Sequence, residues 1–291
     1  MSKTAGFAGL GLMGGSFAKA LRALPDDYRI LALDKNPAAL ERARADGLID
    51  GGFAPQDAPA MLAQCDIVFV CLYPQDSIAF LTRQKSFFKT GAIVTEIAGV
   101  KREIVNHLSD ILRDDVDFIC GHPMAGSEKE GLPHSGAGIF KDKIYIIMPL
   151  PSNKRENIEF FKALIRKIGF ARVTETNCAV HDHKIAFTSQ LCHVIASALV
   201  DSAEDTRITE FGGGSYEDLT RIAMINAPLW TELFLANKKE LIFHITAFEN
   251  SIQKIKQFIQ ENNAPALNAA LQNVREKRIA MSKREASAQE A

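Results

Sequence analysis

The sequence predicts an α/β fold, in which a doubly wound, Rossmann-type parallel sheet is followed by an all-α C-terminal domain. Three observations support this prediction. Short apolar runs alternate with amphipathic stretches through the first half, a glycine-rich loop follows the first run, and no convincing strand follows Cys178. Several runs are apolar throughout, as strands covered on both faces are. Such alternation is typical of right-handed crossovers in a parallel sheet.

The expected elements follow from these patterns in chain order. Strands are expected at residues 5–9, 30–34, 66–72, 92–96, 117–120, 144–148 and 170–173. Polar and apolar residues at helical spacing predict helices at 16–24, 37–45, 101–112 and 153–168. We therefore expect an α/β domain over residues 1–174 and a helical domain over residues 175–291.

An apolar seam runs through the second half with the 4, 3, 4, 3, 4 spacing of a heptad repeat: Leu241, Ile245, Phe248, Ile252, Ile255 and Ile259. The seam spans about two and a half repeats, fewer than a free-standing coiled coil needs. Two interpretations stay open: the helix packs on the core of its own domain, or it is shared with a second subunit. The charged tail from Arg275 onward is expected to fray.

Composition excludes several classes of function. The 291 residues carry 34 Lys and Arg against 35 Asp and Glu, and this balance argues against a nucleic-acid-binding surface. The apolar stretch at residues 4–18 is too short to cross a membrane. The five cysteines form no C-x-x-C pair, so we expect neither a zinc site nor disulfides, and a cytoplasmic protein without a metal.

The glycine-rich loop is the first candidate binding site. It reads G-L-G-L-M-G at residues 9–14, directly after the first expected strand. In this motif the first glycine permits the turn, the second lets backbone N–H groups approach a pyrophosphate, and the third allows close helix packing. Asp34 ends the second expected strand, where a carboxylate binds ribose hydroxyls and repels a 2′-phosphate. This pattern favours NAD over NADP, and the expected cofactor-binding residues are Gly9, Gly11, Leu12, Met13, Gly14 and Asp34.

His122 is the candidate acid–base group. It lies in the segment 121–128, just beyond the strand that is expected to end at Cys120. Ligands of doubly wound sheets bind outside the carboxyl ends of the strands, so His122 is expected near a nicotinamide. An imidazole with a near-neutral pKa suits the removal of a hydroxyl proton while hydride leaves the same carbon. The alternative is a loop histidine with a structural hydrogen bond.

Several motifs together resemble the prephenate/arogenate dehydrogenases of tyrosine biosynthesis. The most specific are H-P-M-A-G at residues 122–126, L-T-R-I-A at 219–223, and Trp230. The resemblance also takes in the glycine loop, 96–101, His181-Asp182, 189–193 and 228–237, and so covers nearly the whole chain.

The resemblance implies NAD-dependent oxidative decarboxylation of prephenate to 4-hydroxyphenylpyruvate. It implies that His122 polarises the ring hydroxyl, that Arg221 pairs with a substrate carboxylate, and that His193 lines the same pocket. It also indicates substrate contacts from Gln190 and Ser127, no metal, and a homodimer formed through the helical domain. Independently, helical spacing places Asp182, Ser189 and His193 within about 40° of one another, which predicts a polar stripe lining a pocket.

Four positions depart from the family pattern. Gly99 stands where the family usually has a serine that orients the histidine, and Gln190 and Cys192 replace a histidine and a proline. Glu217 stands where an arginine is frequent, beside Asp218, which raises arogenate, with its ammonium group, as an alternative substrate. Two further alternatives are a 3-hydroxyacid dehydrogenase or imine reductase of the same two-domain build, and an NAD-binding sensor with a degraded site.

Overall fold

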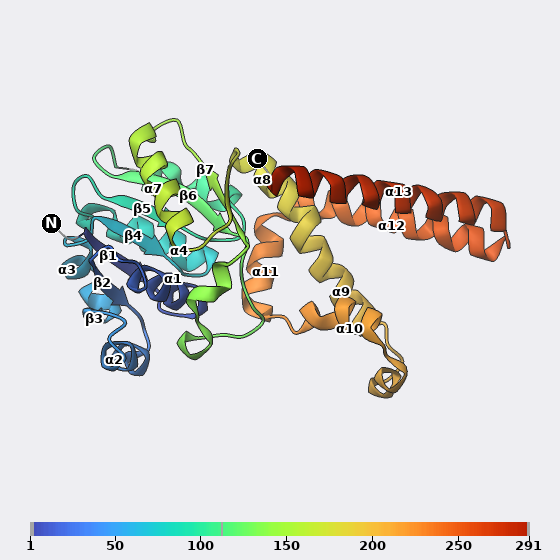
Figure 1. Ribbon diagram of the computed structural model, residues 1–291, viewed down its shortest axis with the longest axis horizontal. Coiled ribbons are helices and arrows are strands. Elements are labelled where there is room, and N and C mark those ends of the chain that lie inside the picture. Colours follow the sequence, from blue (N-terminus) through green and yellow to red (C-terminus); the bar gives the residue numbers. More distant parts are fainter. Residues whose placement is uncertain (1–2, 112, 290–291) are drawn as a thin grey trace. The chain divides into compact units, whose positions relative to one another are not determined.

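The computed structural model describes residues 3–111 and 113–289, and side-chain environments up to residue 282. The chain forms two compact units, Met1–Asn237 and Lys238–Ala291. The first unit contains the sheet and several helices, and the second contains two long helices (Figure 1). No helix of the described residues has the length and apolar character needed to cross a membrane.

Eight strands form one sheet in the order β3-β2-β1-β4-β5-β6-β7-β8. All neighbouring pairs are parallel except β6 and β7, which are antiparallel. The bounds are β1 Lys3–Ala8, β2 Tyr28–Leu33, β3 Gly51–Phe53, β4 Ile67–Val70, β5 Ile93–Glu96, β6 Asp117–Pro123, β7 Ile144–Met148 and β8 Arg172–Glu175. The doubly wound α/β prediction is confirmed.

Two features of this sheet differ from the expectation. The short strand β3 was not predicted, because two glycines and one phenylalanine carry no strand period. The reversal at β7 was also not predicted. The connection from β6 to β7 contains only the 3₁₀ turns Leu132–His134 and Ala137–Phe140, whereas a parallel neighbour requires a crossover connection that is usually an α-helix.

Helices cover both faces of the sheet, and the two faces bury separate apolar clusters (Figure 1). Phe7 and Phe69 point to one cluster, whereas Val68 and Val94 point to the other, as alternation along buried strands requires. The helices are α1 Leu12–Arg22, α2 Pro37–Ala45, α3 Ala58–Leu62, α4 Pro74–Gln84, α5 Arg102–Asn106, α6 Leu108–Ile111 and α7 Arg155–Lys167. The single helix expected at 101–112 is therefore divided, and its last residue lies outside the described residues.

The first unit continues into a series of further helices and short helical turns. They are α8 Cys178–Ile185, a π-helical turn Ala186–Gln190, α9 Leu191–Asp201, a 3₁₀ segment Thr206–Phe211, α10 Gly214–Thr220, a 3₁₀ turn Arg221–Ala223 and α11 Ala227–Ala236. Residues up to 237 group with the sheet because α8 and α11 contact the loop that follows β5. The expected boundary at 174/175 stays a prediction.

The second unit is a pair of packed helices, α12 Lys238–Gln260 and α13 Ala264–Gln289. Asn262 makes the turn between them with a φ of 50°, a left-handed conformation that asparagine tolerates. The tail after Arg275, which was expected to fray, is helical as far as Gln289. Part of the heptad seam stays open to solvent: Ile252 is 47% exposed and Ile259 is 58% exposed.

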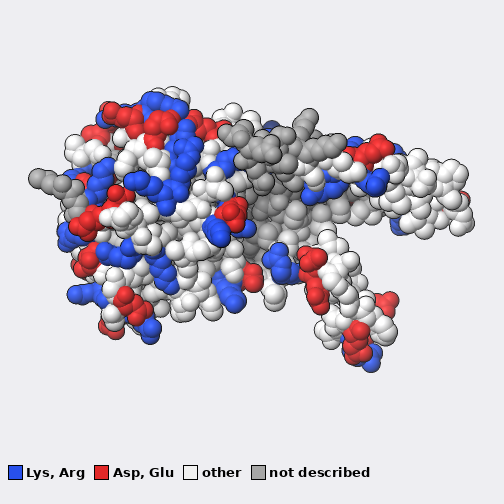
Figure 2. Space-filling model, viewed as in Figure 1, with Lys and Arg blue, Asp and Glu red and all other residues white. Residues whose placement is uncertain are grey.

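The visible face of the α/β part carries charges of both signs. On the face shown in Figure 2, described Lys and Arg side chains are interspersed with Asp and Glu side chains. This pattern agrees with the formal net charge of -1. It differs from the clustered excess of cations that binds nucleic acid.

Candidate active site

The glycine loop connects β1 to α1 at the carboxyl edge of the sheet. Gly9 has a φ of +94°, and a Cβ there would lie 2.6 Å from the Cys71 carbonyl oxygen. A Cβ at Gly14 would lie 2.0 Å from the Gly9 carbonyl oxygen, so both positions require glycine. A Cβ at Gly11, in contrast, would meet no protein atom within 4 Å. No side chain caps α1, so the space at Gly11 adjoins backbone N–H groups suited to a phosphate.

Asp34 follows β2 and is bound to this loop. Its carboxylate accepts a hydrogen bond from the Leu10 backbone N–H at 2.7 Å and another from the Asn36 N–H at 2.8 Å. One contact is made by each oxygen, so each retains acceptor capacity for a further hydroxyl group. The carboxylate thus stands beside the space at Gly11 in the position expected for a ribose-binding residue.

His122 lies at the carboxyl end of β6, half-buried. Its Nδ1 is 2.8 Å from Nε2 of His181, and Nδ1 of His181 is 2.7 Å from Oδ1 of Asp182. Among the described residues, Nε2 of His122 has no hydrogen-bond partner. It faces Gly99, where a Cβ would lie 3.8 Å away.

Asp182 continues this chain of contacts into the backbone. Its carboxylate accepts hydrogen bonds from the N–H groups of Lys101, at 2.9 Å, and Arg102, at 2.8 Å. These donors lie at the start of α5, so a side chain of α8 holds the loop between β5 and α5. The Asp182 carbonyl oxygen accepts a further bond from Asn237, at 2.8 Å.

Lys101 is fully buried and was not identified from the sequence. Its Nζ donates to Oε1 of Glu96 at 2.5 Å, to the Ala98 carbonyl at 2.7 Å and to the Gly121 carbonyl at 2.6 Å. Three N–H donors meet three acceptors, which a buried ammonium requires. Burial raises the pKa of Glu96, and the charge of Lys101 opposes that rise. The apolar context of E-I-A-G-V-K at 96–101 was the available signal.

The electrostatics keep the paired imidazoles uncharged. Burial holds the pKa of His122 well below its usual range, and the neighbouring His181 and Lys101 lower it further. Burial also lowers the pKa of His181, although its hydrogen bond to Asp182 acts in the opposite direction. A neutral imidazole at His122 is a base rather than an acid at physiological pH.

The helical part contributes a second cluster of predicted residues. His193 stacks on Trp230 with ring centroids 3.6 Å apart, and its Nδ1 donates to the Ser189 carbonyl at 3.0 Å. Burial lowers the pKa of His193, and the positive charge of Arg221 lowers it further. Arg221 is exposed and has no ion-pair partner within the described part of the chain.

Helix α11 connects the two clusters. Its Leu233 lies 3.4 Å from the Cβ position of Gly99, next to Nε2 of His122. Its Trp230, three residues earlier and on the same helical face, stacks on His193. Helix α11 therefore borders His122 through Leu233 and His193 through Trp230, and the charge of Arg221 acts on His193.

Gln190 has a different role from the one the sequence suggested. It is only 1% exposed, its Nε2 donates to the Leu233 carbonyl at 2.7 Å, and its Oε1 accepts from Asn237 at 2.8 Å. These contacts hold α11 and leave little of the amide for a substrate. Ser127 is exposed on the loop after β6 and accepts a hydrogen bond from the Lys129 N–H at 3.2 Å.

The polar stripe expected on one helix face is also not formed. The π-helical turn Ala186–Gln190 lies between α8 and α9 and changes the helical phase. Asp182 consequently faces α5, whereas His193 faces Trp230. A π-turn of this kind has no spacing signature in a single sequence.

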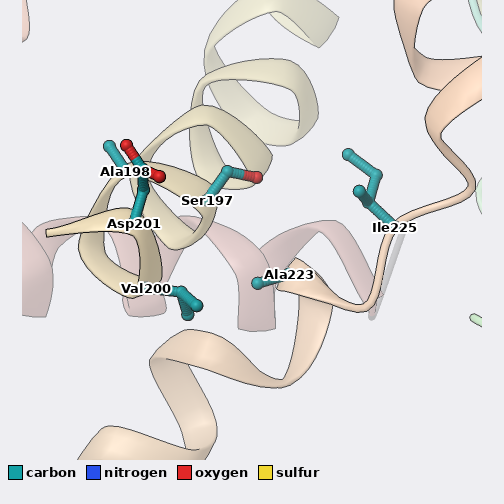
Figure 3. A pocket seen from close by; sticks show the side chains of 6 residues that line it. All are labelled: Ser197, Ala198, Val200, Asp201, Ala223 and Ile225. Carbon is teal, nitrogen blue, oxygen red and sulfur yellow. The ribbon is translucent and has the colours of Figure 1, made fainter. Parts of the chain in front are cut away.

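A shallow hollow lies one turn beyond His193 (Figure 3). Its volume is about 450 Å³, and it separates the second half of α9 from the segment that follows Arg221. The lining residues are Ser197, Ala198, Val200, Asp201, Ala223 and Ile225. Most of them are apolar and none is a predicted catalytic group, but Ser197 lies one helical turn from His193 and Ala223 lies in the same 3₁₀ turn as Arg221.

The fold and these clusters define a nucleotide-binding α/β protein with a helical C-terminal half. The family model described as "Prephenate dehydrogenase, nucleotide-binding domain" matches residues 17–175, and "Prephenate dehydrogenase, dimerization domain" matches residues 177–273. The chain belongs to the prephenate dehydrogenase family.

Individual relatives agree with this assignment. The cyclohexadienyl dehydrogenase of Zymomonas mobilis is 27% identical over 94% of both chains. The prephenate dehydrogenase of Bacillus subtilis is 25% identical over 92% of this chain and 73% of the relative. A crystal structure of Aquifex aeolicus prephenate dehydrogenase with hydroxyphenyl propionate and NAD⁺ is 28% identical, with a TM-score of 0.86 over 97% of this chain and 99% of that chain.

Proposed function

We propose that this protein catalyses the NAD-dependent oxidative decarboxylation of prephenate to 4-hydroxyphenylpyruvate. The observation that carries the proposal is Nε2 of His122, which has no hydrogen-bond partner among the described residues and faces Gly99 beside Leu233 of α11, the helix whose Trp230 stacks on His193 near the charge of Arg221. A base and a free cation on two sides of one region suit a hydroxylated, dianionic substrate. Two of the relatives named above are prephenate dehydrogenases.

The glycine loop would hold the pyrophosphate of NAD, and Asp34 would bind the adenosine ribose. The open space at Gly11 and the uncapped start of α1 fit a phosphate, and the relative from Aquifex aeolicus has NAD⁺ bound. When bound, NAD accepts a hydride. Leu12 and Met13 form the first turn of α1 and would border the same space.

Asp34→Ala is expected to relax the preference for NAD over NADP. The substitution removes the carboxylate that would repel a 2′-phosphate and bind the ribose hydroxyls. The measurement is the ratio of kcat/KM with NAD to kcat/KM with NADP, which should fall about 10-fold or more, since two charge-assisted hydrogen bonds are lost. Asp46→Ala, on the exposed end of α2, is the matched control. An unchanged ratio would mean that Asp34 does not bind the adenosine ribose.

His122 and Arg221 would act directly on the substrate, as a base and as a carboxylate ligand. Nε2 of His122 would accept the proton of the ring hydroxyl as hydride leaves the same carbon. Arg221 would pair with a substrate carboxylate, and His193, held neutral beside it, would line the pocket. Loss of the ring carboxylate as CO₂ makes the ring aromatic, which drives the reaction forward.

Arogenate is the second candidate substrate. Glu217 and Asp218 on α10 are exposed and have no ion-pair partner in the described residues, so either carboxylate could receive the ammonium group of arogenate. The deciding experiment compares kcat/KM for prephenate and arogenate, each with NAD and NADP. We expect the highest value with prephenate and NAD. Tight NAD binding without turnover of either substrate would instead favour a sensor.

We also propose a homodimer formed through the helical half, which the dimerization-domain match supports. Within the first unit, α9 to α11 expose large apolar side chains, and Phe211 is 91% exposed. The C-terminal part of the α12 seam, at Ile252, Ile255 and Ile259, is exposed as well, which favours its sharing with a second subunit. Light scattering should give about twice the chain mass of 32.0 kDa, and a 32.0 kDa particle would exclude the dimer. A cytoplasmic location stays a prediction.

A further inference from the structure

We propose that His181 and Asp182 are positioning residues that hold His122 with its proton on Nδ1, so that Nε2 is the base. The inference deepens the proposed function, because it specifies how the base of that reaction is prepared. It rests on three consecutive hydrogen-bond contacts that run from the backbone of α5 to Nδ1 of His122.

The donor and acceptor of each hydrogen bond follow from Asp182, at the end of the series. Both oxygens of Asp182 accept backbone N–H bonds, so this side chain is the acceptor at the end of the series. Nδ1 of His181, 2.7 Å away, must therefore carry a proton and donate it to Oδ1. In a neutral imidazole the other nitrogen is then an acceptor. Nε2 of His181 thus accepts, and Nδ1 of His122, 2.8 Å away, donates.

The surroundings support this arrangement. The charged and titratable groups near the two imidazoles are Asp182 on α8, Glu96 at the end of β5, Lys101 in the loop after β5, and Cys120 on β6 with Cys178 on α8. Lys101 and Glu96 are paired with each other and fully buried. The positive charge of Lys101 disfavours a proton that would make either imidazole cationic.

Gly99 offers no side chain to orient His122, so the hydrogen bond from His181 matters more. A Cβ at Gly99 would lie 3.8 Å from Nε2 of His122, so a side-chain hydroxyl there could contact the imidazole from its reactive side. With glycine that contact is absent, and the described partner of the His122 ring lies on the Nδ1 side. The orientation and the tautomer of His122 therefore depend on His181.

The tautomer can be measured without any turnover. The full chain, labelled with ¹⁵N in its seven histidines, is examined by long-range ¹H–¹⁵N correlation NMR at about pH 7.5, where an ordinary imidazole is neutral. The resonances of His122 are assigned by their loss in His122→Asn. We expect a protonated Nδ1 and an unprotonated Nε2. A proton on Nε2, or on both nitrogens, would overturn the proposal.

Asp182→Asn reverses the direction of the hydrogen bonds in this series, while the side chain keeps its shape. The asparagine oxygen still accepts from the backbone of α5, but the amide now donates to Nδ1 of His181. His181 then donates from Nε2, and the proton of His122 moves to its own Nε2, where it blocks the base. We expect this shift in the ¹⁵N spectrum and a kcat lower by about two to four orders of magnitude, as for other wrongly protonated catalytic histidines.

The controls separate this effect from a loss of structure. His183→Asn changes an exposed histidine of the same helix and is expected to keep wild-type kcat. NAD affinity should be unchanged in Asp182→Asn, since the glycine loop is not altered. Wild-type kcat in a folded Asp182→Asn variant would overturn the proposal. If that variant does not fold, the wild-type spectrum alone decides. Absence of turnover with prephenate would count against the proposed function and leave the tautomer measurement valid.

Discussion

His122→Asn is expected to lower kcat by about two to four orders of magnitude, the contribution usual for a general base. Asparagine keeps a polar side chain of similar size but cannot accept a proton. NAD affinity should change little, because His122 lies on β6 and the proposed phosphate site lies at the start of α1. The measurement is kcat with saturating prephenate, with NAD binding followed separately.

The matched control for this variant is His134→Asn, which removes an exposed imidazole from the same half of the chain. It should keep wild-type kcat. In the wild type, His122 must be uncharged to act, and its pKa is well below its ordinary value of 6.5. Activity should therefore persist as the pH falls through 6.5 and be lost only at lower pH. Near-normal turnover in His122→Asn would remove this residue from the mechanism.

Arg221→Ala is expected to raise KM about 10- to 100-fold with little change in kcat. A guanidinium–carboxylate pair contributes about 1.5–3 kcal/mol, and each 1.4 kcal/mol is tenfold in binding. The contact would be present in both the bound substrate and the transition state, so its loss appears in KM. Steady-state kinetics with varied prephenate at saturating NAD measures the effect.

Two variants sharpen the Arg221 result. Arg221→Lys keeps the charge without the bidentate geometry and should give an intermediate KM. Arg207→Ala removes another exposed arginine of the helical half, paired with Asp205, and should leave KM unchanged. If Arg221→Ala kept the wild-type KM, the substrate carboxylate would have to bind elsewhere.

The parts of the fold that were predictable are those whose signals are local. The apolar runs identify six of the eight strands closely, because strands buried on both faces must be apolar throughout. The strand β8, at Arg172–Glu175, is displaced by two residues from its expected position at 170–173, since a half-exposed edge strand has a weaker pattern. The glycine loop was predictable because only glycine fits at Gly9 and Gly14.

The features that were missed depend on contacts between distant segments. Neither the antiparallel direction of β7 nor the π-turn Ala186–Gln190 has a spacing signature. The burial of Lys101 was also hidden, because a single lysine next to a helical segment is usually solvated. Gln190 was assigned to the substrate from the family pattern, yet its amide is bonded to Leu233 and Asn237.

We propose above that this protein oxidises and decarboxylates prephenate in one coupled reaction. The most direct measurement is the stoichiometry of NADH formed and CO₂ released when a known amount of prephenate is consumed with excess NAD. We predict one NADH and one CO₂ for each prephenate, with 4-hydroxyphenylpyruvate as the product. NADH without CO₂, or bound NAD with neither product, would show that the protein does not catalyse this coupled reaction.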